Sequence, residues 1–170
     1  QVTKDSRTYF SKSEAQEVID DYFRQFKMLK KWLEDKKLEI SKHGHIYSIF
    51  GRKRRLPNVH SSDQGVASHE VRSGINFLVQ STASDINLLG AIDMNSYIKE
   101  HGLKSKIFAL VHDSILAEVP DHEVEHYCTR LKEFIQKPRQ GCVIKGAPIG
   151  CDFDIGQDYS FGKFEKTYEA

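Results

Sequence analysis

The sequence predicts an α+β fold in which long helices pack on a small antiparallel sheet, and two observations lead to this expectation. Apolar residues recur at helical spacing over residues 15–33 and again over residues 66–100. Short apolar runs flank polar turns over residues 45–59 and 106–120, which is typical of β-hairpins. Helices and antiparallel hairpins in this order favour an α+β architecture.

The length and composition are those of an ordinary globular domain. The 170 residues suffice for one domain with its own core, and the net charge of +1 gives no global field. Nucleic-acid contact would therefore come from local basic patches. No apolar run approaches the ~20 residues needed to span a bilayer, so no membrane partner is expected. Three cysteines without a CxxC pair favour a reducing compartment, which predicts a cytoplasmic location.

The first predicted helix begins at a capping box and ends at a glycine. Ser11 and Glu14 have the spacing at which each side chain caps the backbone N–H of the other. The helical pattern then continues to about His43, and Gly44 is suited to the left-handed cap conformation. A hairpin with a basic turn at Gly51 is expected next.

The second predicted helix covers residues 66–100 and is expected to break near Gly90. After the hairpin at 106–120, Asp121 is expected to cap a third helix that runs to about Lys137. The tail is expected to contain one more strand. The inward side of the second helix is predicted to carry Ile75, Leu78, Thr82, Ile86 and Leu89.

Polar side chains stand at the tip of the second hairpin, at His112, Asp113 and Ser114. The apolar run before this tip does not alternate with polar residues, which predicts burial on both faces. An Asp on such a turn can present an oxygen to a divalent metal, and Mg²⁺ takes one or two carboxylates plus phosphates and water. The alternative is an ordinary turn, since Asp and Ser are frequent in turns for hydrogen-bonding reasons alone.

Three polar residues recur every four positions on the second predicted helix. Arg72, Asn76 and Gln80 therefore share one side of that helix. Their side chains carry the donors and acceptors that contact bases and sugars in a nucleic acid. A solvated helix side would show the same pattern, so this alternative stays open.

The turn of the first hairpin is strongly basic. Arg52, Lys53, Arg54 and Arg55 follow one another, and such a run can contact phosphates, each contact adding a salt-dependent increment of binding. The alternative is a surface run of charge without a specific partner.

Together, three segments in this order resemble the C-terminal part of family A DNA polymerases, the bacterial polymerase I type. They are GRKRRLPN, RSGINFLVQSTASDI and ALVHDSILAEVP. The family pattern is a Gly-Arg-Arg hairpin, an R-x-x-x-N-x-x-x-Q helix and a V-H-D-E hairpin called motif C. The resemblance implies a palm hairpin with part of the fingers: a fingers-side helix and basic hairpin over residues 1–65, then a palm helix, motif C hairpin and C-terminal strand over residues 66–170.

The resemblance also implies roles for individual residues. Asp113 matches the motif C aspartate that binds two catalytic Mg²⁺ ions, and His112 matches its neighbour that approaches the primer terminus. Arg72, Asn76 and Gln80 match residues that touch the minor groove of the duplex, where correct base pairs present nearly the same acceptors. The implied partners are primer-template DNA and deoxynucleoside triphosphates.

One substitution and one absence set this chain apart from the complete family pattern at the metal site. Ser114 stands where the family usually has Glu, so one negative charge near the metals is missing. The family's second metal aspartate and its nucleotide-binding helix lie upstream of everything in this chain. We therefore expect an upstream polypeptide to complete the fold and to share the two Mg²⁺ ions. The start at Gln1 fits a split or cleaved polymerase, and a phage source would place it in the host cytoplasm or nucleoid.

Other interpretations of individual residues stay open. Ser114 would also fit a non-catalytic DNA-binding subunit with a vestigial metal site. His122 and His126 lie in an H-x-x-E-H pattern found in zinc hydrolases, although a solvated helix start accounts for them as well. Asp152 and Asp154 share one side of the last predicted strand and are expected at the surface.

Overall fold

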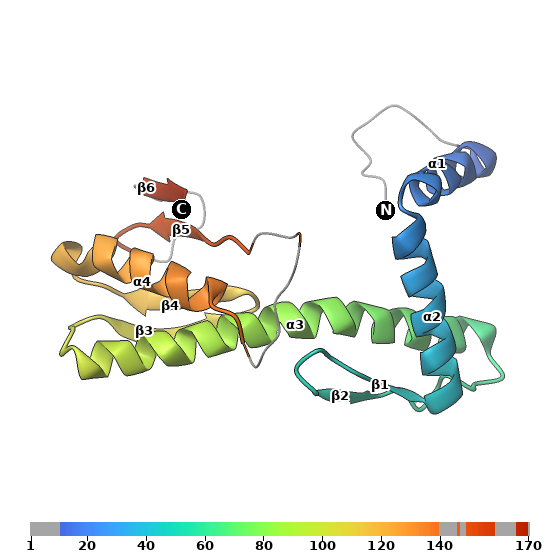
Figure 1. Ribbon diagram of the computed structural model, residues 1–170, viewed down its shortest axis with the longest axis horizontal. Coiled ribbons are helices and arrows are strands. Elements are labelled where there is room, and N and C mark those ends of the chain that lie inside the picture. Colours follow the sequence, from blue (N-terminus) through green and yellow to red (C-terminus); the bar gives the residue numbers. More distant parts are fainter. Residues whose placement is uncertain (1–10, 140–145, 147–148, 159–165, 170) are drawn as a thin grey trace. The chain divides into compact units, whose positions relative to one another are not determined.

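The protein consists of helices and small two-stranded sheets (Figure 1), as the predicted α+β class requires. The computed structural model describes residues 11–139, 146, 149–158 and 166–169, the last four as backbone only. The elements in chain order are α1 (Lys12–Gln25), α2 (Lys27–His43), β1 (His45–Tyr47), β2 (Lys53–Arg55), α3 (Gln64–Glu100), β3 (Lys106–Val111), β4 (Ser114–Glu118), the 3₁₀ turn η1 (Asp121–Glu123), α4 (Val124–Gln136), β5 (Asp152–Ile155) and β6 (Lys166–Glu169).

The chain divides into two compact units. The first unit comprises Gln1–Ile46 and Arg54–Asn76, and the second comprises Tyr47–Lys53 and Phe77–Ala170. Helix α3 contributes its first part to one unit and its second part to the other. The boundary predicted after residue 65 stays a prediction.

The first unit begins with the predicted capping box. The Glu14 backbone N–H donates to Ser11 Oγ at 3.2 Å, and the Ser11 N–H donates to Glu14 Oε2 at 2.7 Å. The single helix expected from the sequence is two helices, because Phe26 leaves the helical region with φ −108° and ψ 58°. Neither glycine nor proline marks this break, so the sequence pattern could not show it. Gly44 ends α2 in the left-handed conformation, with φ 62°, as predicted.

The core of the first unit forms where α2, the first hairpin and α3 meet. Ile40, Ile46 and Leu56 are fully buried there. Gly74 of α3 lies against them, and a Cβ added to it would come within 2.6 Å of Leu56 Cδ1 and 2.8 Å of Ile40 Cδ1. The glycine therefore allows α3 to approach these side chains closely.

The second unit has a larger core between the C-terminal part of α3, α4 and the second hairpin. Its partly buried margin includes Ile107, Ile115 and Ala117 of that hairpin and Phe50 of the first. Among the residues predicted to face inward along α3, Ile86 belongs to the buried cluster. The buried members are Ile86, Met94, Ile98, Tyr127, Leu131 and Ile135.

Helix α3 continues through Gly90 without the predicted break. A Cβ at Gly90 would lie 2.7 Å from Ile135 Cγ1 and 3.5 Å from the Ile135 Cα. Glycine is therefore explained at this position by the close approach of α4 rather than by a change in backbone direction.

Replacing Gly90 with alanine should destabilise the second unit. The added methyl group must displace Ile135, and such overpacking costs about 1–3 kcal/mol, against a gain of about 1 kcal/mol in helix propensity. Urea unfolding of the chain should show a lower midpoint for Gly90→Ala. The exposed Ser84→Ala on the same helix is the control and should change the midpoint little; an unchanged Gly90→Ala midpoint would contradict the close packing.

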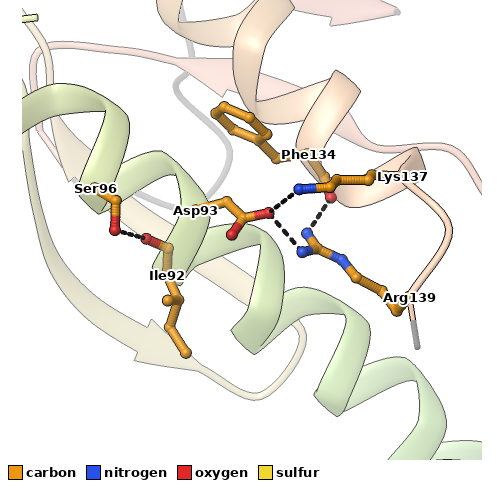
Figure 2. Close-up of polar contacts among 6 residues, drawn as sticks. All are labelled: Ile92, Asp93, Ser96, Phe134, Lys137 and Arg139. Carbon is orange, nitrogen blue, oxygen red and sulfur yellow. Dashed lines mark hydrogen bonds and ion pairs between the residues drawn. The ribbon is translucent and has the colours of Figure 1, made fainter. Parts of the chain in front are cut away.

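Ion pairs fasten the end of α4 to α3 (Figure 2). The Asp93 carboxylate accepts a hydrogen bond from Lys137 Nζ at 3.3 Å and another from the guanidinium of Arg139. That guanidinium also donates to the carbonyl oxygen of Phe134. Burial alone would raise the pKa of Asp93, but the hydrogen bonds from Arg139 and Lys137 outweigh it and hold this pKa below its ordinary value. These contacts fix the C-terminal end of α4 on α3.

The connection after the second hairpin differs in detail from the prediction. A 3₁₀ turn starts at Asp121, and α4 begins only at Val124, without a side-chain cap from Asp121. The end before Pro138 is as expected, since Lys137 leaves the helix in an extended conformation. Strand β5 matches the expected tail strand and pairs antiparallel with β6. Within the described residues, every helix is too short or too polar to span a bilayer.

Candidate functional site

The tip of the second hairpin is a two-residue loop that presents His112 and Asp113. Strands β3 and β4 pair antiparallel up to Val111 and Ser114, which face each other directly beside the loop. His112 has a φ of 55°, and among the described residues it is the one non-glycine with positive φ. This conformation is strained by about 1–2 kcal/mol for an L-residue, although His tolerates it better than most. Such strain is often retained where a side chain must point in a set direction.

The tip is exposed, so the prediction of a hairpin buried on both faces is wrong for the described chain. Phe108 on β3 is 64 % exposed, and Leu110 and Val111 are exposed as well. Ile107 packs on the core of the second unit from the other side of the strand. The apolar run before the tip therefore has one covered face and one uncovered face.

Asp113 offers an exposed carboxylate at the hairpin tip, a group of the kind that binds metal ions. The residue is exposed at the tight turn, and no side chain from the described part of the chain pairs with it. No three His, Cys, Asp or Glu side chains within the described residues gather into a metal site. One carboxylate of this kind fits Mg²⁺, which takes its other ligands from phosphates, water and a second carboxylate.

A buried glutamate fastens the base of the same hairpin. Glu123 accepts hydrogen bonds from the backbone N–H groups of Lys104 and Ser105 at 2.9 Å and from Ser105 Oγ at 2.6 Å. Glu123 lies in η1, shortly after β4, and Lys104 and Ser105 lie directly before β3. These hydrogen bonds therefore join the two ends of the hairpin. The Lys104 N–H and the Ser105 hydroxyl lower the pKa of the Glu123 carboxyl from its ordinary value of 4.5, against the opposing effect of burial. Sequence reasoning missed this role, because hydrogen-bonding to a distant backbone leaves no local pattern.

Replacing Glu123 with glutamine should lower the melting temperature at neutral pH. It should also reduce the fall in melting temperature as the pH is lowered. Because the pKa of folded Glu123 is depressed, its stabilising contribution is present above 4.5 and is lost as the pH falls through the lowered value. Thermal unfolding followed from neutral pH into acid should converge for wild type and Glu123→Gln. Exposed Glu125→Gln is the control; equal curves for all three proteins would contradict the role of Glu123.

The basic turn is held by contacts within the protein. The Arg52 guanidinium pairs with Asp85 of α3 through two hydrogen bonds, from Nη2 to Oδ1 at 2.5 Å and from Nε to Oδ2 at 3.3 Å. Lys53 Nζ lies 5.4 Å from the centre of the Tyr47 ring. Arg54 donates from Nη2 to the hydroxyl oxygen of Ser73 at 2.8 Å.

Asp85 is a site residue that sequence reasoning missed. It is only 7 % exposed and stands beside Ile86 of the core. A carboxylate buried beside the apolar side of a helix needs a cation as its partner. The position of Asp85 directly before the inward-facing Ile86 is the sequence signal that could have indicated such a pair.

The three polar residues predicted to share a side of α3 all belong to that helix and are exposed. Arg72, Asn76 and Gln80 keep their four-residue spacing without interruption of the helix. They are therefore available to solvent or to a ligand, and their role in DNA contact stays a prediction.

The remaining candidate residues each have their own local contacts. His122 in η1 is exposed and lies 3.8 Å from Glu123 Oε1, while His126 Nε2 lies 3.0 Å from the Tyr97 hydroxyl. Asp152 and Asp154 are exposed on β5, as expected. Of the cysteines, Cys128 and Cys151 are free and half-buried, and Cys142 lies outside the described residues.

Comparison with known proteins identifies the family. The model for DNA polymerase family A matches residues 4–160. The chain belongs to DNA polymerase family A. Over 93 % of its length it is 46 % identical to the DNA polymerase of Escherichia phage T5, and over 94 % it is 31 % identical to that of Bacillus phage SP01.

A solved structure supports the same assignment. The present chain resembles the POL domain of Pol1 from M. smegmatis, whose structure was determined in complex with DNA primer-template and dNTP. The TM-score is 0.70 and the identity 31 %, over 75 % of this chain and 22 % of the other. This similarity confirms the predicted α+β fold class. The chain spans 19 % and 18 % of the lengths of the two phage polymerases, so it corresponds to a fragment of them.

Proposed function

We propose that this chain is the C-terminal palm and fingers-side portion of a template-directed DNA polymerase, which transfers deoxynucleotides to a primer 3′ end. The observation that carries the proposal is the exposed two-residue tip with Asp113, in a chain of family A. A carboxylate on a short, paired hairpin is held in place by the strand ladder, yet remains open to metal and substrate.

In this proposal Asp113 is a catalytic metal ligand and His112 contacts the primer terminus. Two Mg²⁺ ions, when bound, would activate the primer 3′-hydroxyl and stabilise the pyrophosphate leaving group. Asp113 would be one of the residues that hold these ions, from the hairpin tip. The positive φ of His112 sets the direction of its backbone at the loop, and the exposed imidazole can reach a neighbouring primer end.

DNA contacts are assigned to α3 and to the basic turn. Arg72, Asn76 and Gln80 are exposed and belong to an uninterrupted helix, which supports contact with the duplex minor groove. Lys53 and Arg54 would contact phosphates, which carry charge without sequence information.

The upstream polypeptide remains part of the proposal. One carboxylate does not hold two Mg²⁺ ions, so a second metal aspartate and a nucleotide-binding helix would come from that polypeptide. Exposed apolar side chains in each unit support a partner surface, because uncovered apolar area often marks an interface. In the first unit they are Val18, Ile19 and Tyr22 of α1, Phe26 at the break and Met28 of α2, and in the second unit they are Phe108, Leu110 and Val111 of β3.

Primer extension tests the proposed function. Mg²⁺ and four deoxynucleoside triphosphates would be supplied to this chain alone and to the chain combined with the upstream polypeptide. Extension only in the combination would support a polymerase completed across two polypeptides. Extension by the chain alone would contradict the need for a second polypeptide, and Asp152 and Asp154 would then be tested as ligands.

A second candidate function rests on Ser114. Because this residue stands where the family usually has Glu, a non-catalytic DNA-binding subunit is the alternative. Duplex binding without Mg²⁺-dependent extension in either preparation would favour it.

A further inference from the structure

The loop between β1 and β2 is closed by hydrogen bonds among its own residues. The Ser48 N–H donates to the Arg52 carbonyl at 2.9 Å, and the Gly51 N–H donates to the Ser48 carbonyl at 2.9 Å. The Arg52 N–H in turn donates to Ser48 Oγ at 3.2 Å. Ser48 is buried, and Phe50 packs on the core of the second unit. The backbone of this loop is therefore set before any ligand arrives.

The side chain of Arg52 continues this fastening to α3. Two of its N–H groups point at the two oxygens of Asp85, an arrangement that fixes both distance and orientation. Asp85 is 7 % exposed and would be left as a buried charge without Arg52, whereas the Arg52 side chain is itself 57 % exposed. The pair thus joins the surface of the turn to a buried anchor on the helix.

Pairing also lowers the charge that Arg52 offers to DNA. The guanidinium and the Asp85 carboxylate together carry no net charge, so the pair attracts a phosphate less than a free guanidinium would. Lys53, the next residue, pairs with no carboxylate in the described part of the chain, and its Nζ lies 5.4 Å from the centre of the Tyr47 ring.

We propose that Arg52 is a positioning residue, which through Asp85 holds the basic turn on α3 so that Lys53 meets the DNA backbone, and that Arg52 does not itself bind phosphate. This revises the role expected from the sequence for Arg52. It rests on the proposed function, because it assigns different roles to Arg52 and Lys53 in the DNA-binding turn of a polymerase.

The test compares salt dependence of primer-template binding by the assembled polymerase, this chain with the upstream polypeptide. The variants are Arg52→Gln, Arg52→Lys, Asp85→Asn and the Arg52→Gln/Asp85→Asn double variant, with Lys53→Gln as the matched control. A phosphate contact contributes about 0.9 to the slope of log affinity against log salt. Lys53→Gln should therefore lower that slope by about 0.9.

Each variant of the pair should weaken binding several-fold and lower the slope by no more than Lys53→Gln does, because the released turn no longer holds Lys53 at the DNA backbone. The double variant should be no weaker than either single one. Arg52→Lys should behave like Arg52→Gln, because lysine keeps the charge but not the two-pronged geometry. Two results would overturn the proposal: Arg52→Gln lowering the slope while Asp85→Asn has no effect, or Arg52→Lys binding like wild type.

Thermal unfolding of the same variants without DNA is a second measurement, and it would reveal any variant that is misfolded. Coupling between positions 52 and 85 in this double-mutant cycle is expected, and additive effects would overturn the proposal. If the wild-type assembly binds no duplex, the proposed function fails instead, so the two failures are distinguishable.

Discussion

Replacing Asp113 with alanine is expected to abolish primer extension by the assembled polymerase while primer-template binding persists. In the proposed function Asp113 is a metal ligand, and loss of such a ligand removes several kcal/mol of transition-state stabilisation, a factor of roughly a thousand or more in rate. The side chain is exposed on a two-residue loop, so its removal leaves no cavity and breaks no contact within the described fold. Single-turnover extension and duplex affinity should be measured on the same preparations.

Asp152→Ala is the matched control for this experiment. Asp152 is also an exposed carboxylate at the edge of a hairpin, on β5, and its removal should leave extension close to wild type. Normal extension by Asp113→Ala would show that the metal assignment is wrong. Equal loss in both variants would point to a general charge effect rather than to metal binding at the tip.

Replacing Met94 with alanine is expected to destabilise the second unit by about 2–5 kcal/mol. Met94 is fully buried in the cluster that α3 and α4 form beneath the second hairpin. Truncation removes apolar contacts and leaves a cavity, because a close-packed core relaxes only in part. Urea unfolding should show a large fall in the midpoint, and extension by the assembled polymerase should be lost at a lower temperature.

The neighbouring Asn95→Ala provides the comparison for Met94. Asn95 is exposed on the same helix, and a surface change of this kind usually alters stability by within about 0.5 kcal/mol. Similar midpoints for the two variants would mean that Met94 does not occupy the core.

Features set by neighbouring residues were predictable from the sequence. The capping box of Ser11 and Glu14, the left-handed cap at Gly44 and both hairpins came out as expected. Each depends on residues a few positions apart, whose spacing and backbone preferences act locally. The place of Asp113 at a hairpin tip was predictable for the same reason, as was family membership, which rests on an ordered set of short motifs.

The tertiary structure alone decided how distant segments use these elements. Gly90, expected as a break, is instead the place where α4 packs closely on a continuous α3. Arg52 meets Asp85 across 33 positions, and Glu123 reaches the backbone at Lys104 and Ser105. Burial and pairing of this kind depend on which surfaces come together in space. Local sequence sets the backbone preferences of each segment, whereas the partner of a buried charge is set by packing.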